Sequence, residues 1–161
     1  IVRLLLENGL QLDKPSSNGS TPLFGIMGNF DDDASLVEAF LKLGAEASTT
    51  DPDLNTPLHL AAHASFVELL LKHGADSFAR NLNGEVPLHL ASEYWRVDVV
   101  KLLLARGANV RATASDGRTA LHNAARDGSD DLVMLMIQHG ADVRAVTSDG
   151  ETPLHSVCEF W

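Results

Sequence analysis

The sequence predicts an all-α solenoid of stacked helix–turn–helix units joined by extended, hairpin-like loops. A leucine-rich run that ends in glycine recurs five times, at Gly9, Gly44, Gly74, Gly107 and Gly140, with spacings of 35, 30, 33 and 33 residues. A second motif follows each of these glycines, and its second residue always lies 13 positions further on. The chain is 45% hydrophobic but only 6% aromatic, which is typical of a folded protein with an aliphatic core.

The second motif predicts the start of the first helix in each unit. It reads TPLF from Thr21, TPLH from Thr56 and Thr152, VPLH from Val86, and TALH from Thr119. Threonine is favoured at a helix N-cap, and proline is tolerated at the next position because its missing N–H has no helical partner there. Apolar residues, among them alanines that let a neighbour approach closely, then predict a short buried helix.

The glycine-ended runs predict the second helix of each unit. In the run before Gly74, Val67–Leu71 supplies an apolar stripe, and the glycine ends the helix as a left-handed cap. The stretches Gly107–Gly117 and Gly140–Gly150 lack helical periodicity and end in Ser-Asp-Gly, a strong turn signal. Each unit is therefore expected to be helix, turn, helix and extended loop.

The repeat resembles the ankyrin repeat, whose period is about 33 residues and whose signature is T-P-L-H-x-A. The resemblance covers the whole chain and is carried by TPLHLA at 56–61, VPLHLA at 86–91 and TALHNA at 119–124, with GAD or GAN after the helix-ending glycines. Phe24 departs from the signature at the histidine position, and Trp95 stands where the family usually turns on glycine. The resemblance implies an ankyrin-repeat array.

We expect one array over residues 1–161. Its predicted parts are a partial repeat at 1–15, repeats at 16–50, 51–80, 81–113 and 114–146, and a partial repeat at 147–161. Terminal units without polar caps leave their stacking faces uncovered, here at Leu4–Leu6 and Phe160–Trp161. We therefore expect a piece of a longer array that is a monomer in its full-length context, with dimerisation as the alternative.

Two repeats depart from the common length between their paired helices. The repeat at 16–50 has two extra residues near Asn29–Asp33, where insertions into an exposed turn are usual. The repeat at 51–80 lacks three residues near His63–Phe66, so its helices are expected to change direction almost at once. A chain break closed up in the numbering would look the same.

Composition excludes several classes of function. The net charge is −10 and the isoelectric point about 4.9, which argues against binding a nucleic-acid backbone. No apolar run approaches the roughly 20 residues that a membrane span needs, and no targeting signal is visible at Ile1–Gly9. Because the only cysteine is Cys158, we expect a reducing, cytoplasmic location, with the nucleus as a further possibility.

The sequence predicts no catalytic site, cofactor or metal. His59, His89, His122 and His155 recur one repeat apart, but repeats about 10 Å apart place them too far from one another to share an ion. The resemblance implies that these histidines bond neighbouring backbone between repeats. We expect Asp31–Asp33 to be a solvated acidic turn rather than a calcium site.

The remaining candidates for chemistry have structural interpretations. We expect Cys158 to be buried, and His73 and His139 to end helices. No HExxH, CxxC, GxGxxG, Walker-type or serine-triad motif is present, so we expect a protein that is not an enzyme.

The resemblance implies a protein partner, contacted through a concave face made by the loop tips and the exposed ends of the first helices. Tyr94 and Trp95 stand out because polar residues or glycine are usual there, and buried aromatic area often dominates an interface. The alternative for Trp95 is a packing role over Ala64–Phe66. The contact positions implied by the resemblance are Asp53, Asn55, His63, Leu82, Asn83, Glu85, Glu93, Tyr94, Trp95, Ser115, Asp116, Arg118, Arg126, Asp127, Ser148, Asp149 and Glu151.

The sequence therefore favours a non-enzymatic scaffold that recruits a protein through this face. The alternative is a substrate-recruiting or regulatory arm of a larger ubiquitin ligase, kinase or immune receptor. Acidic positions around Arg118 and Arg126 indicate a partner of mixed or basic charge.

Overall fold

Helices and loops make up the described part of the chain. The computed structural model describes residues 4, 9, 11–27, 33–94 and 96–158. Within these residues the elements are nine named helices, and an isolated antiparallel bridge joins Thr113 to Thr119. The all-α repeat fold is confirmed. The chain divides into two compact units, residues 1–76 and 77–161, and each is described by itself.

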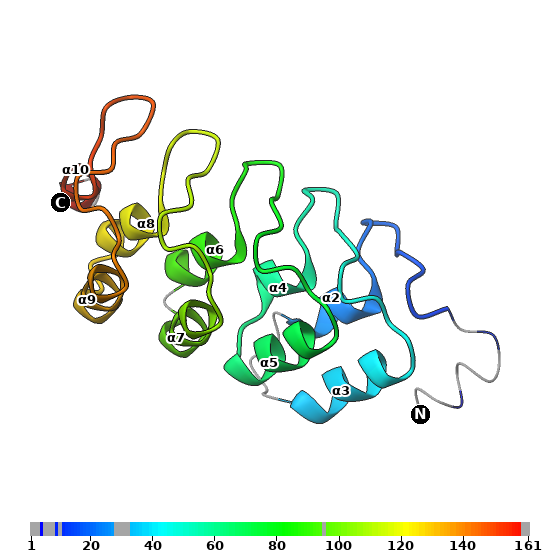
Figure 1. Ribbon diagram of the computed structural model, residues 1–161. Helices are drawn as coiled ribbons and strands as arrows, with labels where there is room; N and C mark the ends of the chain where they lie inside the picture. Colours follow the sequence, from blue (N-terminus) through cyan, green and yellow to red (C-terminus); the bar gives the residue numbers. More distant parts are fainter. Residues whose placement is uncertain (1–3, 5–8, 10, 28–32, 95, 159–161) are drawn as a thin grey trace. The chain divides into compact units, whose positions relative to one another are not determined.

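The first unit holds two helix pairs (Figure 1). Its helices are α2 (Pro22–Met27), α3 (Ala34–Lys42), α4 (Pro57–Leu60) and α5 (Ala64–Lys72). The first helices α2 and α4 pack together, as do the second helices α3 and α5. Leucine, methionine and phenylalanine fill the space between them, and the fully buried ones are Leu23, Met27, Leu58, Phe66 and Leu70.

The second unit repeats this arrangement, and two of its first helices are longer than those of the first unit. Its helices are α6 (Pro87–Glu93), α7 (Val97–Ala105), α8 (Ala120–Arg126), α9 (Asp130–Gln138) and α10 (Pro153–Val157). The first helices α6, α8 and α10 pack in a row, and α9 packs against α7 and α8. Figure 1 shows the loops of this unit projecting to the same side of its helices. The helices thus form a base from which the loops extend.

The helix starts lie where the sequence motif predicts them. Thr56, Val86, Thr119 and Thr152 are the N-cap residues of α4, α6, α8 and α10, in extended backbone conformation. The threonine backbone N–H of Thr56 donates to Nδ1 of His59 at 3.0 Å, and the threonine hydroxyl lies 2.9 Å from the same ring nitrogen. The histidine three positions after the N-cap therefore accepts a hydrogen bond from a backbone N–H that has no partner within the helix.

The second helices end as predicted. Gly74, Gly107 and Gly140 each have φ of +87°, the left-handed region that favours glycine. His73 and His139 are the C-cap residues before two of these glycines, which confirms their place at helix ends. The helix ends thus recur at the predicted period.

In the shortened repeat at 51–80, the three missing residues come from the first helix. Helix α4 has four residues, whereas α6 and α8 have seven each. Three residues remain between α4 and α5, and the N–H of Ala62 donates to the carbonyl oxygen of Met27 at 3.1 Å. The predicted abrupt change of direction is therefore achieved by ending the first helix early.

Several expectations fall on residues outside the described part of the chain. They concern most of the predicted segment 1–15, Asn29–Asp32 in the longer repeat, Trp95, and Phe160–Trp161. Leu4, which is described, is largely exposed. In the described ranges the longest helices have nine residues, and none combines the length and apolar character that crossing a membrane requires.

Candidate functional site

The loop tips are the most regular polar feature of the second unit. In the tip 147–151 the N–H of Thr147 donates to the carbonyl oxygen of Glu151 at 2.9 Å, and the N–H of Gly150 donates back to Thr147 at 3.0 Å. The tips 81–85 and 114–118 close in the same way. Each tip is therefore a small hydrogen-bonded hairpin.

Hydrogen bonds from side chains to the backbone of the same loop stabilise these hairpins. The Asn81 amide oxygen accepts from the backbone N–H groups of Asn83 and Glu85, at 3.0 and 2.9 Å. The Asp116 carboxylate accepts from the N–H of Arg118 at 2.9 Å. Such Asx-type bonds fix a loop conformation before any partner arrives, which lowers the ordering cost of binding.

Neighbouring tips in the second unit are bonded to each other. The N–H of Ser115 donates to the carbonyl oxygen of Asn83 at 2.8 Å, and the N–H of Ser148 donates to Asp116 at 2.7 Å. The three tips therefore form one connected polar edge, which we call the tip edge, residues 81–85, 114–118 and 147–151. A Cβ at Gly117 would lie 3.1 Å from Cα of Thr147, so the close approach requires glycine there.

An ion-pair network lies at the ends of the first helices α6 and α8. Arg126 Nη2 is 3.1 Å from a Glu93 carboxylate oxygen, and Arg126 Nε is 3.4 Å from Asp127. Burial alone lowers the pKa of Arg126, but the hydrogen bond and charge of Glu93 with the charge of Asp127 raise it above its ordinary value. The arginine is held cationic between two carboxylates and ties adjacent repeats together.

A second network links two tips. Arg118 Nε is 3.4 Å from Asp116, and Arg118 Nη2 is 3.7 Å from Glu151. The arginine side chain is the more buried partner, while both carboxylates remain about half exposed. Arg126 is likewise less exposed than Glu93, although Asp127 is the most buried member of that network. The carboxylates of Asp116, Glu151 and Glu93 are therefore more accessible to solvent than the arginines that they pair with.

Tyr94 supplies an exposed aromatic ring beside this acidic surface. It is the C-cap residue of α6, and its side chain is exposed. The Arg96 guanidinium lies 5.1 Å from the ring centroid, within the range of a cation–π contact. Arg96 was not among the predicted contact residues, because an arginine at a helix N-cap has no sequence signal for such a role.

The structure brings most of the predicted contact residues to one unit. Those in the second unit lie on the tips and the ends of α6 and α8: Leu82, Asn83, Glu85, Glu93, Tyr94, Ser115, Asp116, Arg118, Arg126, Asp127, Ser148, Asp149 and Glu151. Asp53, Asn55 and His63 belong to the first unit, where Asp51 accepts from the backbone N–H groups of Asp53 and Asn55. Trp95 lies outside the described residues.

Two of the four recurring histidines, His89 and His122, have a structural role. His89 and His122 are buried, and each accepts from the backbone N–H of its N-cap residue at Nδ1, at 3.1 Å. Nε2 is then the protonated nitrogen and donates to a carbonyl oxygen 3.2 Å away, Arg118 for His89 and Glu151 for His122. Burial lowers the pKa of both rings. The prediction of bonding between repeats is confirmed for these two.

Two expectations about chemistry concern Cys158 and the acidic run Asp31–Asp33. The prediction that Cys158 is buried is wrong: it is the C-cap residue of α10 and is exposed, as is Leu154 one turn earlier, because the described part of the chain leaves this face of α10 uncovered. Asp33 caps α3 by accepting from the N–H of Leu36 at 3.2 Å, while Asp31 and Asp32 lie outside the described residues. Among the residues that are described, no group of three metal-binding side chains comes together.

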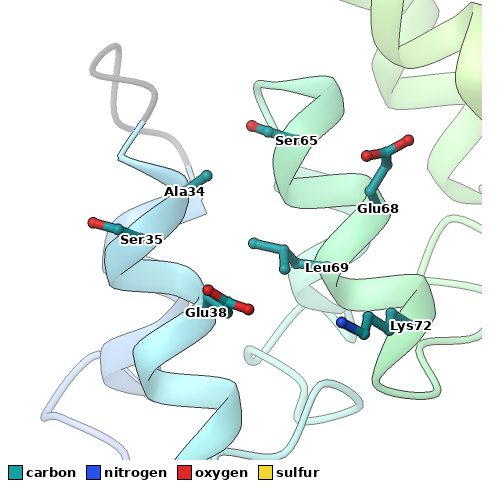
Figure 2. A pocket seen from close by; sticks show the side chains of 7 residues that line it. All are labelled: Ala34, Ser35, Glu38, Ser65, Glu68, Leu69 and Lys72. Atoms are coloured by element: carbon teal, nitrogen blue, oxygen red, sulfur yellow. The ribbon is translucent and has the colours of Figure 1, made fainter.

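A shallow hollow of about 470 Å³ lies between α3 and α5 in the first unit (Figure 2). Leu69 points toward α3, and Glu38 lies across from Lys72. Glu38 already pairs with Lys42 at 2.8 Å, and the hydrogen bond and charge of that lysine lower the Glu38 pKa. The remaining lining residues are Ala34, the serines Ser35 and Ser65, and Glu68.

Fold and surface together define a class: a helical repeat protein that presents braced polar loops from a packed helical base. The family model for ankyrin repeats, in three copies, matches residues 26–114 and 108–160. The chain therefore belongs to the ankyrin-repeat family. Ankyrin repeats generally mediate protein–protein interactions and are typically non-enzymatic. A search of curated proteins finds no match to the chain.

Proposed function

We propose that this protein is a non-enzymatic recruitment module that binds a protein partner through the tip edge and the adjoining ends of α6 and α8. The observation that carries the proposal is the hydrogen-bonded tip edge, in which Ser115 bonds Asn83 and Ser148 bonds Asp116. Loops held in place before binding cost less entropy to immobilise, and they present their side chains at fixed spacing.

The surface favours a basic, extended segment of the partner. Its two arginines in ion pairs, Arg118 and Arg126, are partly buried, whereas Asp116 and Asp149 are exposed and Glu151 is partly exposed. Complementary charge raises the rate of encounter and rejects acidic competitors. Tyr94 adds the kind of exposed aromatic group that supplies binding energy at interface centres. The partner therefore combines lysine or arginine with an apolar side chain that covers this ring.

The setting we propose follows from composition. A net charge of −10 repels nucleic-acid backbones and disfavours self-association, so the module acts on proteins and as a monomer. One cysteine in 161 residues is consistent with a reducing, cytoplasmic environment.

Affinity capture from cell lysate with mass spectrometry tests the proposal. The bait is compared with a tip variant, Tyr94→Ala with Asp116→Lys, and with a matched control, Met134→Ala with Asp131→Lys. The control makes the same kinds of change on exposed residues of α9, away from the tips. We expect a set of proteins retained by the wild type and the control but lost by the tip variant. Identical profiles for all three baits would contradict the proposal.

A further inference from the structure

Two asparagine–glycine pairs occupy the same place in two loop tips. Asn18–Gly19 lies in the tip 16–20 of the first unit, and Asn83–Gly84 lies in the tip 81–85 of the second. Both asparagines are exposed, and the two glycines have φ of +80° and +72°. In each tip the glycine N–H donates to the carbonyl oxygen three residues earlier, at 2.9 Å. The two pairs are therefore alike in sequence, exposure and loop geometry. A third pair in the sequence begins at Asn8, which lies outside the described residues.

The two tips differ in how the next tip along the chain holds them. In the second unit the carbonyl oxygen of Asn83 accepts from the N–H of Ser115 at 2.8 Å. In the first unit Pro52 stands at the position that corresponds to Ser115, and proline has no N–H to donate. Pro52 nevertheless lies against the tip, since a Cβ at Gly19 would be 2.6 Å from its Cγ. The bond that fixes the peptide unit after Asn83 thus cannot form between Pro52 and Asn18.

The side chains of the two asparagines also have different partners. The side-chain oxygen of Asn18 accepts from Ser16 Oγ and from the N–H of Ser20, the latter at 3.2 Å. Two donors on one amide oxygen stabilise the negative charge that develops there when a nucleophile attacks Cγ. The Asn83 amide instead donates from Nδ2 to a Glu85 carboxylate oxygen 3.4 Å away, which places a negative charge beside it. Attack on the amide carbon is therefore favoured at Asn18 and opposed at Asn83.

We propose that Asn18 is a site of spontaneous deamidation and that the fold protects Asn83 from the same reaction. The backbone nitrogen of Gly19 loses its proton and bonds to Cγ of Asn18, which closes a succinimide ring. The bond from Cγ to Nδ2 breaks, and ammonia leaves carrying that proton. Water then opens the ring at either carbonyl and gives aspartate or isoaspartate. Glycine leaves the attacking nitrogen unhindered in both pairs, so the bond from Ser115 and the side-chain partners separate them.

The aspartate product matches the residues that other tips already carry. Asp116 and Asp149 stand at the position of Asn18 in the tips 114–118 and 147–151. Asp116 accepts there from the N–H of Arg118 at 2.9 Å, as Asn18 accepts from Ser20. Aspartate therefore fits this loop and adds one negative charge to it. Isoaspartate lengthens the main chain of the tip and breaks its hydrogen-bond pattern.

Peptide mapping by mass spectrometry tests the proposal on the chain of 161 residues. The protein is incubated in mildly alkaline buffer, and the conversion of amide to acid is followed at Asn18 and Asn83, with synthetic standards for isoaspartate. In the folded chain Asn18 should react at least about threefold faster than Asn83, the effect of roughly one hydrogen bond on a rate. In guanidinium chloride, which unfolds the loops, the two rates should agree within about twofold.

Exchanging the two residues at the corresponding position tests the cause. Pro52→Ser supplies an N–H and should slow the reaction at Asn18 at least about threefold, and Ser115→Pro should accelerate it at Asn83 by a similar factor. Both positions are exposed and each variant takes the residue of the other tip, so we expect both to fold, which circular dichroism checks.

Three results would overturn the proposal. One is an equal rate at the two sites in the folded chain. Another is the same difference in guanidinium chloride, which would assign it to the sequence rather than to the fold. The third is a folded Pro52→Ser variant that deamidates at Asn18 as fast as the wild type.

Discussion

The Nε2 atom of His122 lies 3.2 Å from the backbone carbonyl oxygen of Glu151, which belongs to the loop before α10. The other ring nitrogen of His122 accepts from the N–H of Thr119, so one neutral ring joins a helix start to the following loop. His89 makes the equivalent bond to Arg118. Protonation of Nδ1 removes an acceptor and places a charge in a buried site.

Stability should therefore fall as the solution is acidified. Burial lowers the pKa of His89 and His122, whereas in the unfolded chain they return to about 6.5. The unfolded state then binds more protons below that pH, and the histidine contribution, complete above it, is lost as pH falls through the folded pKa. Urea unfolding from pH 8 to pH 5 measures this loss. A His122→Gln variant should be less stable at pH 8 and change less with pH, and an unchanged pH dependence would refute the assignment.

One tip carries a residue that its backbone conformation disfavours. Leu54 has φ of +60°, in the position that Gly19, Gly84, Gly117 and Gly150 hold in the other tips. A side chain in this region costs about 1–2 kcal/mol, and Leu54 is exposed, so it offsets little of that by packing. Leu54→Gly should raise the free energy of unfolding by up to about 1 kcal/mol, after the entropy cost of glycine. Thermal or urea unfolding measures the change.

The opposite substitution provides the matched control for that prediction. Gly117→Ala introduces a Cβ at φ of +84° and within 3.2 Å of backbone atoms of the neighbouring tip. It should destabilise the protein by about 1–3 kcal/mol. If Leu54→Gly were also destabilising, the left-handed conformation at Leu54 would be wrong.

The helix core should respond strongly to a cavity. Leu103 on α7 has no exposed surface. Leu103→Ala should lower the free energy of unfolding by about 2–5 kcal/mol, since it loses apolar burial and leaves a void. Leu82→Ala, on an exposed side chain of the same type, should change it by less than about 0.5 kcal/mol. Equal effects in urea unfolding would show that the helical register is wrong.

The ion pair between Glu93 and Arg126 should couple two adjacent repeats. A double-mutant cycle with Glu93→Gln and Arg126→Met isolates their interaction, which we expect at about 0.5–1 kcal/mol because the pair is partly exposed. The coupling should shrink in 1 M salt, where the Debye length is about 3 Å. A coupling energy of zero at low salt would mean that the network orders side chains without stabilising the fold.

The features that recur from repeat to repeat could be predicted from the sequence. The glycine at the helix ends and the histidine after Thr56, Val86, Thr119 and Thr152 recur because the same backbone geometry is needed in these units. The prediction for Cys158 was wrong because periodicity gives the face of a helix but not what packs against that face.

Contacts between side chains of different repeats could not be predicted from the sequence. Glu93 and Arg126 were both predicted contact residues, yet their pairing depends on rotamers and on the separation of α6 and α8. The same holds for Leu154: its motif position predicts burial, as is found for Leu121, yet its side chain is exposed. Both depend on what packs beside a residue rather than on the residue's place in the repeat.

The most direct test of a recruiting role for the tip edge is the affinity of a captured partner measured by calorimetry. The wild type is compared at low and high salt with Tyr94→Ala/Asp116→Lys and with Met134→Ala/Asp131→Lys. The tip variant should bind at least about tenfold more weakly, the control should match the wild type, and added salt should weaken wild-type binding. A tip variant that binds like the wild type would contradict the role of the tips.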